Sequence, residues 1–180
     1  MKAPRTFEFR PLRLEDERSF REALAEFRDE SPSFDFALGF DDSLSFSEYL
    51  RRLDNWSRGV DLPANFVPGA FYVGVVDGVV VGRLSLRYRL NEFLEKVGGH
   101  LGYGVRPSQR RFGYATEMLR RALPLCAEQG IDRALVTCDI GNVGSITVIE
   151  RSGGVFERVT CEPDLEIQKR RYWINTSGQG

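Results

Sequence analysis

The chain has 180 residues, of which 42% are hydrophobic and 28% are charged, as is typical of a single soluble globular domain. Its 25 Lys and Arg nearly balance its 26 Asp and Glu, and this net charge of -1 argues against a nucleic-acid-binding protein. No apolar run approaches the length that spans a membrane, which argues against a membrane protein.

The N-terminal third of the chain predicts one strand and two amphipathic helices. Phenylalanines alternate with polar residues over residues 6–10, which predicts a strand. Apolar residues at helical spacing predict a helix over residues 15–30 and a second helix over residues 45–57. A stretch rich in Pro, Phe and Asp, residues 31–42, connects the two helices.

The middle of the chain predicts an antiparallel hairpin. Asp77-Gly78 lies between two apolar runs, and this dipeptide is a strong signal for a two-residue hairpin turn. We expect strands over residues 70–76 and 79–88, a short helix over residues 90–96 and a further strand over residues 99–105.

The last part of the chain changes to a strand–helix alternation. Gly130 is a fitting cap for a long helix, and Asn142 is a fitting cap for a short one. The nearly all-apolar segment 134–138 predicts a strand that is buried on both faces. We expect helices over residues 113–129 and 142–152, and strands over residues 134–138, 155–161 and 166–174.

These elements predict one α/β domain with a mixed sheet, an α+β arrangement that spans residues 1–180. An antiparallel N-terminal meander is followed by a βαβ unit, whose strands 99–105 and 134–138 should run parallel. Residues 176–180 should form a frayed tail.

Targeting and metal-binding signals are not found in the sequence. The first ten residues carry charges and lack the apolar core of a signal peptide, so we expect a cytoplasmic protein. Cys126, Cys138 and Cys161 are odd in number and lack metal-ligand spacing, which argues against a disulfide framework and a metal site. We expect the three cysteines to be buried as small hydrophobic residues.

Residues 105–116 have the features of an anion-binding turn, because they leave a strand and enter a helix. Free backbone N–H groups and the helix dipole favour an anion at a helix start. Gly113 and Ala115 keep the turn bare, while Arg110 and Arg111 supply forked donors suited to phosphate. The alternative is an ordinary helix start with two solvated arginines. The glycine patterns of dinucleotide and nucleoside triphosphate sites are absent.

This turn resembles the pyrophosphate loop [R/Q]-x-x-G-x-[G/A] of the Gcn5-related N-acetyltransferases (GNAT), matched here by residues 110–115 with Val105 and Pro107 before them. The resemblance implies a GNAT-like fold with acetyl-CoA as cosubstrate. It also implies that backbone groups near Val105 pair with the pantetheine arm like an added strand. The implied cofactor contacts are Val105, Arg110, Arg111, Phe112, Gly113, Tyr114, Ala115 and Thr116.

A second block resembles the family's Asn-x-x-Ala/Ser, followed by a helix that ends in Gly. Asn142, Ser145 and Gly153 match it, which implies that Asn142 and Ser145 also contact the cofactor. The alternative for Asn142 is a plain helix cap, and the two roles can coexist. Similarity to a bacterial group of predicted acetyltransferases extends over residues 98–107, 136–139 and 171–174.

The implied reaction is direct attack of an amine on the thioester in a ternary complex. An ammonium group has a pKa of roughly 10, so a base must take its proton. His100 matches the position of a Glu base in ribosomal-protein-type relatives, and we expect His100, Gly102 and Gly104 to share an open strand face. The alternative is a structural or surface histidine. The family's acid, a tyrosine, is matched by Ile149, which leaves the thiolate to be protonated by water or by another residue, with Tyr103 and Tyr114 as substitutes.

The acceptor, a primary amine of a small molecule or peptide, should bind beside the first two helices. Aromatic residues and three aspartates gather there, either as a pocket or as core and solvated loop. A non-catalytic acyl-CoA-binding sensor or scaffold is the alternative to the enzyme, and the absent tyrosine favours it. A monomer and a homodimer both stay open. The aromatic residues and aspartates expected at the acceptor site are Phe34, Phe36, Phe40, Phe46, Trp56, Phe66, Asp35, Asp41 and Asp42.

Overall fold

The computed structural model describes residues 6–28, 30, 34–40, 43–162 and 167–177. Seven strands form one mixed sheet in the order β1-β2-β3-β4-β5-β7-β6, with β4 and β5 parallel and the other neighbours antiparallel. This confirms the predicted meander followed by a parallel strand pair. The strands are β1 (Phe7–Pro11), β2 (Gly69–Val76), β3 (Val79–Arg87), β4 (Leu101–Val105), β5 (Arg133–Asp139), β6 (Val155–Glu162) and β7 (Ile167–Asn175).

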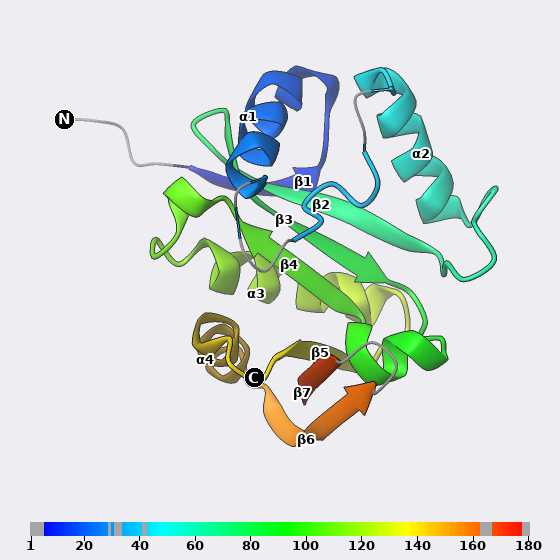
Figure 1. The fold of residues 1–180 in the computed structure, drawn as a ribbon, viewed down its shortest axis with the longest axis vertical. Coiled ribbons are helices and arrows are strands. Elements are labelled where there is room, and N and C mark those ends of the chain that lie inside the picture. The colour runs from blue at the N-terminus through cyan, green and yellow to red at the C-terminus, as the bar shows by residue number, and fades with distance from the viewer. Residues whose placement is uncertain (1–5, 29, 31–33, 41–42, 163–166, 178–180) are drawn as a thin grey trace.

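Helices cover both faces of the sheet (Figure 1). Two of the four α-helices pack on β2 and β3 from one side, and the other two pack against the opposite face, so each face carries its own hydrophobic cluster. The helices are α1 (Glu17–Phe27), α2 (Phe46–Arg58), α3 (Tyr114–Glu128) and α4 (Val143–Arg151), with short 3₁₀ or π turns at Leu14–Asp16, Leu94–Gly98 and Pro107–Gln109.

Local signals in the sequence explain most of the element boundaries. Asp77 and Gly78 both have positive φ, at 51° and 78°, as the two-residue hairpin turn between β2 and β3 requires. Ser45 and Glu48 form a reciprocal capping box at the start of α2, and the left-handed Gly59 ends that helix.

Several expected boundaries shift. The strand expected at residue 99 begins at Leu101, because Gly99 has a φ of 66° and cannot continue an extended strand. The short helix expected over residues 90–96 is a π turn at Leu94–Gly98. The first helix ends at Phe27 rather than residue 30. Residue 166, the first of the last expected strand, lies outside the described residues.

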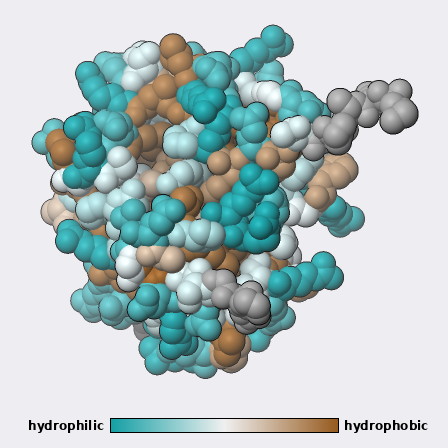
Figure 2. Space-filling view, turned by 180° about the vertical axis from the view of Figure 1, so that it is seen from behind, coloured by the Kyte–Doolittle hydropathy of each residue, from teal (hydrophilic) through white to brown (hydrophobic). Residues whose placement is uncertain are grey.

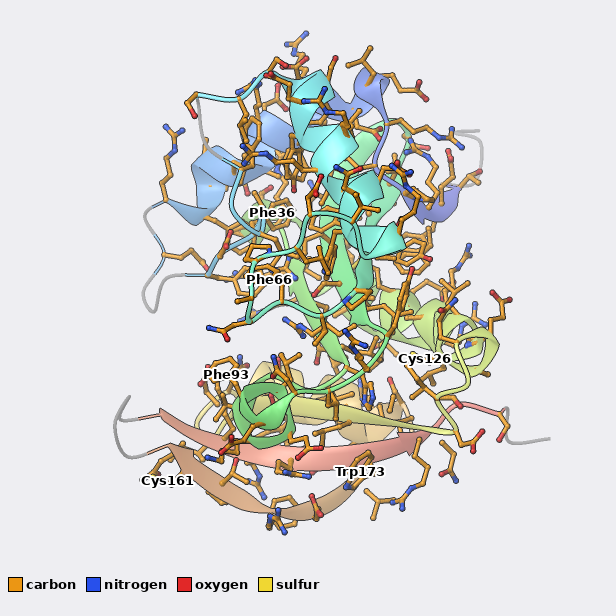
Figure 3. The ribbon with its side chains drawn as sticks, turned by 90° about the vertical axis from the view of Figure 1, so that its right-hand side faces the viewer. Phe36, Phe66, Phe93, Cys126, Cys161 and Trp173 are labelled. Atoms are coloured by element: carbon orange, nitrogen blue, oxygen red, sulfur yellow. The ribbon has the colours of Figure 1, made fainter. Side chains whose placement is uncertain are left out.

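Two further expectations need correction at single residues, and residues 178–180 of the expected frayed tail lie outside the described residues. Thr176 belongs to the folded domain rather than to a frayed tail, because it is 3% exposed and its hydroxyl donates to the carbonyl oxygens of Ile131 and Asp132. Cys161 is exposed on the outer strand β6, whereas Cys126 and Cys138 are buried as expected (Figure 3).

The surface mixes hydrophilic and hydrophobic residues when the molecule is seen from behind (Figure 2). None of the helices in the described part of the chain is both long and apolar enough to cross a membrane. Within the same residues, no three His, Cys, Asp or Glu side chains gather where they could hold a metal ion.

Candidate active site

The parallel strands β4 and β5 separate soon after they meet. Along its whole length β4 pairs with β3, but its ladder with β5 contains only the pair Leu101 and Val136 among the described residues. Residues 102–105 therefore present a strand edge on the β5 side that no neighbouring strand covers. Such an edge can accept an extended chain through backbone hydrogen bonds.

A cavity of about 890 Å³ lies beside this edge, between the N-termini of α3 and α4. Its volume falls in the range of ligand-binding clefts. Nine of the ten residues expected to contact the cofactor line it, although they come from two separate segments of the chain. These are Val105, Arg110, Arg111, Gly113, Tyr114, Ala115, Thr116, Asn142 and Ser145.

Phe112 is the exception among the expected contacts. Its side chain is 62% exposed and lines a smaller cavity of about 260 Å³ next to Asp77 and Val79. The ring packs against that of Tyr114 in a tilted arrangement, with 5.9 Å between the ring centroids. Left-handed residues flank it on both sides, at Arg111 and Gly113, and the resulting turn places Phe112 outside the large cavity.

The backbone of the turn is shaped for an anion. Arg111 has a φ of 68° and Gly113 a φ of 82°, and a left-handed arginine is an uncommon conformation of the kind that gathers at functional sites. No side chain caps the start of α3. The N–H groups of the first helical turn, at Tyr114, Ala115 and Thr116, consequently have no acceptor within the helix and are available to a ligand.

Three arginines line the cavity, and they differ in their partners. Arg110 donates from both terminal nitrogens to the carboxylate of Glu30, at 2.8 and 2.5 Å. Arg111 and Arg151 have no ion-pair partner among the described residues. Arg111, just before the start of α3, and Arg151, at the end of α4, therefore bring positive charge to the cavity without an ion-pair partner in the described part of the chain, and positive charge near a helix start attracts phosphate groups.

Asn142 caps α4. Its side-chain oxygen accepts a hydrogen bond from the N–H of Ser145 at 3.0 Å, which confirms the capping role considered from the sequence. Because Asn142 and Ser145 also line the cavity, the cap and a ligand contact are compatible.

Tyr103 points from β4 toward the start of α4. Its hydroxyl donates to the carbonyl oxygen of Ser145 at 3.4 Å, and its side chain lines the cavity. Burial raises the pKa of the Tyr103 phenol well above its usual value, so the hydroxyl keeps its proton at neutral pH. Ile149, at the position where the resemblance expects a tyrosine, is fully buried in the core and is not among the described residues that line the cavity.

His100 lies just before β4 and is 8% exposed. The Nδ1 atom of its ring accepts a hydrogen bond from the backbone N–H of Leu135 at 2.9 Å, while the backbone N–H of His100 donates to the carbonyl oxygen of Leu135 at 2.7 Å. Burial, and secondarily the charge of Arg87, lowers its pKa to about 4. His100 thus ties β5 to the chain at the point where the two strands begin to separate, and it is not among the described residues that line the cavity.

The face shared by His100, Gly102 and Gly104 is not open as expected. The ring of Phe34 covers Gly104 so closely that any side chain there would collide with it. The guanidinium of Arg83 lies 4.4 Å from the centre of the Phe34 ring and donates to backbone carbonyl oxygens at Phe36 and Gly102. The sequence pattern could not predict this cover, because Phe34 comes from a segment distant along the chain.

The aromatic residues expected at the acceptor site have different roles. Phe36 and Phe46 are buried core residues around Phe20, and Phe66 is 55% exposed (Figure 3). Phe34 alone among the expected aromatics lines the cavity within the described residues. Asp41 and Asp42 lie outside the described residues, and Asp35 caps its own loop by accepting from the N–H of Ala37.

The structure adds cavity residues that the sequence reasoning missed. Thr147 and Arg151 follow Val143 at helical spacing, so the periodicity of α4 could have identified them once Asn142 was assigned. Glu30 and Asp139 reach the cavity through tertiary packing that no local pattern signals. The residues added are Phe27, Glu30, Asp139, Val143, Gly144, Thr147, Val148 and Arg151, while Phe34, Tyr103 and Gly104, which the sequence had already singled out, line the cavity as well.

Comparison with known proteins agrees with this geometry. A family model described as an acetyltransferase (GNAT) domain matches residues 7–155. Mycobacterium smegmatis RimJ in complex with CoA-disulfide superposes with a TM-score of 0.68 at 20% identity, covering 94% of this chain and 81% of that chain. An N-acetyltransferase from Staphylococcus aureus Mu50 gives a TM-score of 0.62 at 14% identity, covering 96% and 99%.

A third structure, yncA from Salmonella typhimurium with its cofactor acetyl-CoA, gives a TM-score of 0.61 at 12% identity, covering 97% and 96%. At these identities the likeness establishes the fold. No curated protein matches the chain by sequence.

Proposed function

Because the chain belongs to the GNAT acetyltransferase family, we propose that it transfers the acetyl group of acetyl-CoA to a primary amine of a small molecule or peptide. The observation that carries this proposal is the cavity itself. Within the described residues, the cavity brings together a strand edge that no neighbouring strand covers, the start of α3 without a side-chain cap, the start of α4 capped by Asn142, and two arginines without an ion-pair partner. The acetyl-CoA in the Salmonella typhimurium structure and the CoA-disulfide in the RimJ structure support CoA as the ligand.

Different elements of the cavity would bind different parts of the cofactor. The edge of residues 102–105 would pair with the amides of the pantetheine arm, as a further strand would. The N–H groups at Tyr114, Ala115 and Thr116 would hold the pyrophosphate, with Arg111 supplying a charged donor. Asn142 and Ser145 would contact the arm from the α4 side.

The chemistry is attack of a neutral amine on the thioester carbonyl in a ternary complex. The C–N bond forms, the C–S bond breaks and the departing thiolate takes a proton. We assign Tyr103 as the donor of that proton, since it is a buried phenol that lines the cavity and keeps its proton at neutral pH. The attacking amine loses its own proton to a base, and positioning by the cavity contributes the rest of the rate.

The base role suggested for His100 is less well supported than a structural one. Its Nδ1 is occupied by the N–H of Leu135, and its side chain is buried away from the described lining of the cavity. We propose that His100 holds β4 and β5 together below the point of divergence, and that the base is water or another side chain.

A non-catalytic acyl-CoA sensor is the second candidate, favoured by the buried Ile149 at the tyrosine position. Thiol release from acetyl-CoA in the presence of a panel of amines, polyamines, amino acids and peptides separates the two functions. The enzyme predicts amine-dependent thiol release and a product 42 Da heavier than one amine of the panel, a mass increase of about one acetyl group. CoA binding without any amine-dependent release across the panel would favour the sensor.

A further inference from the structure

Three carboxylates, two on α1 and one just after it, form a row that faces the turn leading into α3. Glu22 and Glu26 lie one turn apart on the same side of α1, and Glu30 follows three residues after the end of that helix at Phe27. Their partners are Arg106, Ser108 and Arg110, which are spaced two residues apart. Arg106 pairs with Glu22 and Glu26, Ser108 bonds to Glu26, and Arg110 pairs with Glu30. The row therefore joins α1 to the turn at three points.

The central member of the row is structural. The two oxygens of Glu26 accept from the side-chain Nε of Arg106 at 2.5 Å and from the backbone N–H of Ser108 at 2.9 Å. Burial alone would raise the pKa of Glu26, but these hydrogen bonds outweigh it and lower the pKa. Neither Glu26 nor Arg106 is among the described residues that line the large cavity.

The last member of the row lies inside the cavity. Arg110 and Glu30 both line it, with side chains 46% and 28% exposed. Glu30 occupies both terminal nitrogens of the Arg110 guanidinium, and the remaining Nε points to the carbonyl oxygen of Val105 at 3.3 Å. Both terminal nitrogens of Arg110 are therefore bound to a carboxylate, inside the same cavity as the start of α3 that the proposed function assigns to the pyrophosphate.

A carboxylate and a pyrophosphate are alternatives for such a fork. Both bind it through two parallel N–H···O bonds, and holding both at once would bring two anions into contact. Building on the proposed function, we propose that Glu30 is an internal competitor for the pyrophosphate of CoA. Glu30 thereby limits the affinity of the protein for its cofactor, whereas Glu26 one helical turn earlier only fixes the turn in place.

The direction in which Glu30→Gln changes the affinity for CoA distinguishes this competition from a purely structural ion pair. If Glu30 merely braces the turn, as Glu26 does, Glu30→Gln loosens the site and weakens CoA binding. If Glu30 competes, Glu30→Gln frees Arg110 and tightens CoA binding. We expect the dissociation constant of CoA, measured by calorimetry, to fall about three- to fivefold in Glu30→Gln, the upper part of the range for a partly exposed charged pair.

Glu22→Gln is the matched control. It removes one negative charge from the same face of α1, and Glu22 lies 3.7 Å from Arg106 without being among the described lining residues. The CoA dissociation constant of Glu22→Gln should stay within about twofold of the wild-type value, because long-range charge effects are screened at physiological salt. An equal gain in CoA affinity in Glu22→Gln and Glu30→Gln would overturn the proposal.

A double-mutant cycle tests whether the effect passes through Arg110. In an Arg110→Gln background, adding Glu30→Gln should change the CoA dissociation constant by less than about twofold. Unchanged or weakened binding in Glu30→Gln alone contradicts competition while leaving the proposed function intact. Absence of CoA binding in the wild-type protein contradicts the proposed function instead, so the two failures are distinguishable. Thermal melts of each variant confirm that the compared proteins are folded.

Discussion

At the scale of the single residue, His100 illustrates how burial decides the chemistry of a side chain. An imidazole with an ordinary pKa titrates near neutrality, but burial and then Arg87 lower the pKa of His100 to about 4. His100 is therefore neutral at physiological pH, and its Nδ1 is an acceptor for the N–H of Leu135. These contacts favour a structural role at the junction of β4 and β5.

This role predicts a specific dependence of stability on pH. The pKa of His100 is lower in the folded protein than the value of about 6.5 expected in the unfolded chain. Its contribution to stability is complete above about pH 6.5 and is lost as the pH falls toward 4, because the unfolded state then binds the proton that the folded state refuses. His100→Gln should lack this titration, so its stability deficit in urea unfolding should shrink from pH 7 to pH 4.5. A deficit that is constant over this range would contradict the assignment.

The same residue yields a kinetic prediction. With His100 in a structural role, the pH profile of kcat/KM between pH 6 and 9 should keep its shape in His100→Gln, even if its height changes. An inflection near neutrality that is present in the wild-type protein and absent in His100→Gln would restore the base role.

A substitution of Tyr103 tests its proposed role as the acid that protonates the departing CoA thiolate. Tyr103→Phe keeps the ring between β4 and α4 but removes the hydroxyl that donates to the carbonyl oxygen of Ser145. If Tyr103 protonates the thiolate, kcat should fall by about 10²-fold while the CoA dissociation constant stays nearly unchanged. Steady-state kinetics and calorimetry on the same variant measure both quantities. A kcat within threefold of the wild-type value, roughly the scatter of such comparisons, would remove Tyr103 from the mechanism.

At the scale of the element, the start of α3 places the strictest conformational and charge requirements on its residues. Gly113 has a φ of 82° and precedes a first turn without a side-chain cap. Gly113→Asp would place a carboxylate against the N–H groups assigned to the pyrophosphate, so CoA binding should be lost in calorimetry. Gly113→Asn is the matched control, since it has a similar shape, tolerates the left-handed conformation and carries no charge. Wild-type CoA affinity in Gly113→Asp would show that the loop assignment is wrong.

Elements were predictable from the sequence where their signals are local. Asp77 and Gly78 identify the hairpin, and residues 105–116 identify the turn into α3, because one continuous segment brings those residues together. Phe112, which the resemblance assigns to the cofactor contacts, lines the smaller cavity next to the left-handed Arg111, and no residue preference signals a left-handed arginine.

At the scale of the whole molecule, the parts of the site that the sequence did not predict are those that tertiary packing brings in. Glu30 reaches Arg110 from the end of α1, although the two are 80 residues apart in the chain. Phe34 covers Gly104 by the same kind of long-range packing, which is why the expected open face is closed. Such contacts depend on how the helices cover the sheet, and periodicity within one element carries no information about them.

The cavity also links the two halves of the sheet, since β4, α3 and α4 all contribute to it. A ligand that fills it should therefore stabilise the whole fold and not one element. At about one hundred times its dissociation constant, such a ligand adds roughly 2.7 kcal/mol to the free energy of unfolding.

The thermal melt of the wild-type protein with and without saturating CoA tests the central claim most directly. The account predicts a clear rise in Tm with CoA and much smaller shifts with ATP or NAD, which lack the pantetheine arm that the edge of β4 would bind. A Tm that saturating CoA leaves unchanged would contradict the assignment of the cavity as the acyl-CoA site.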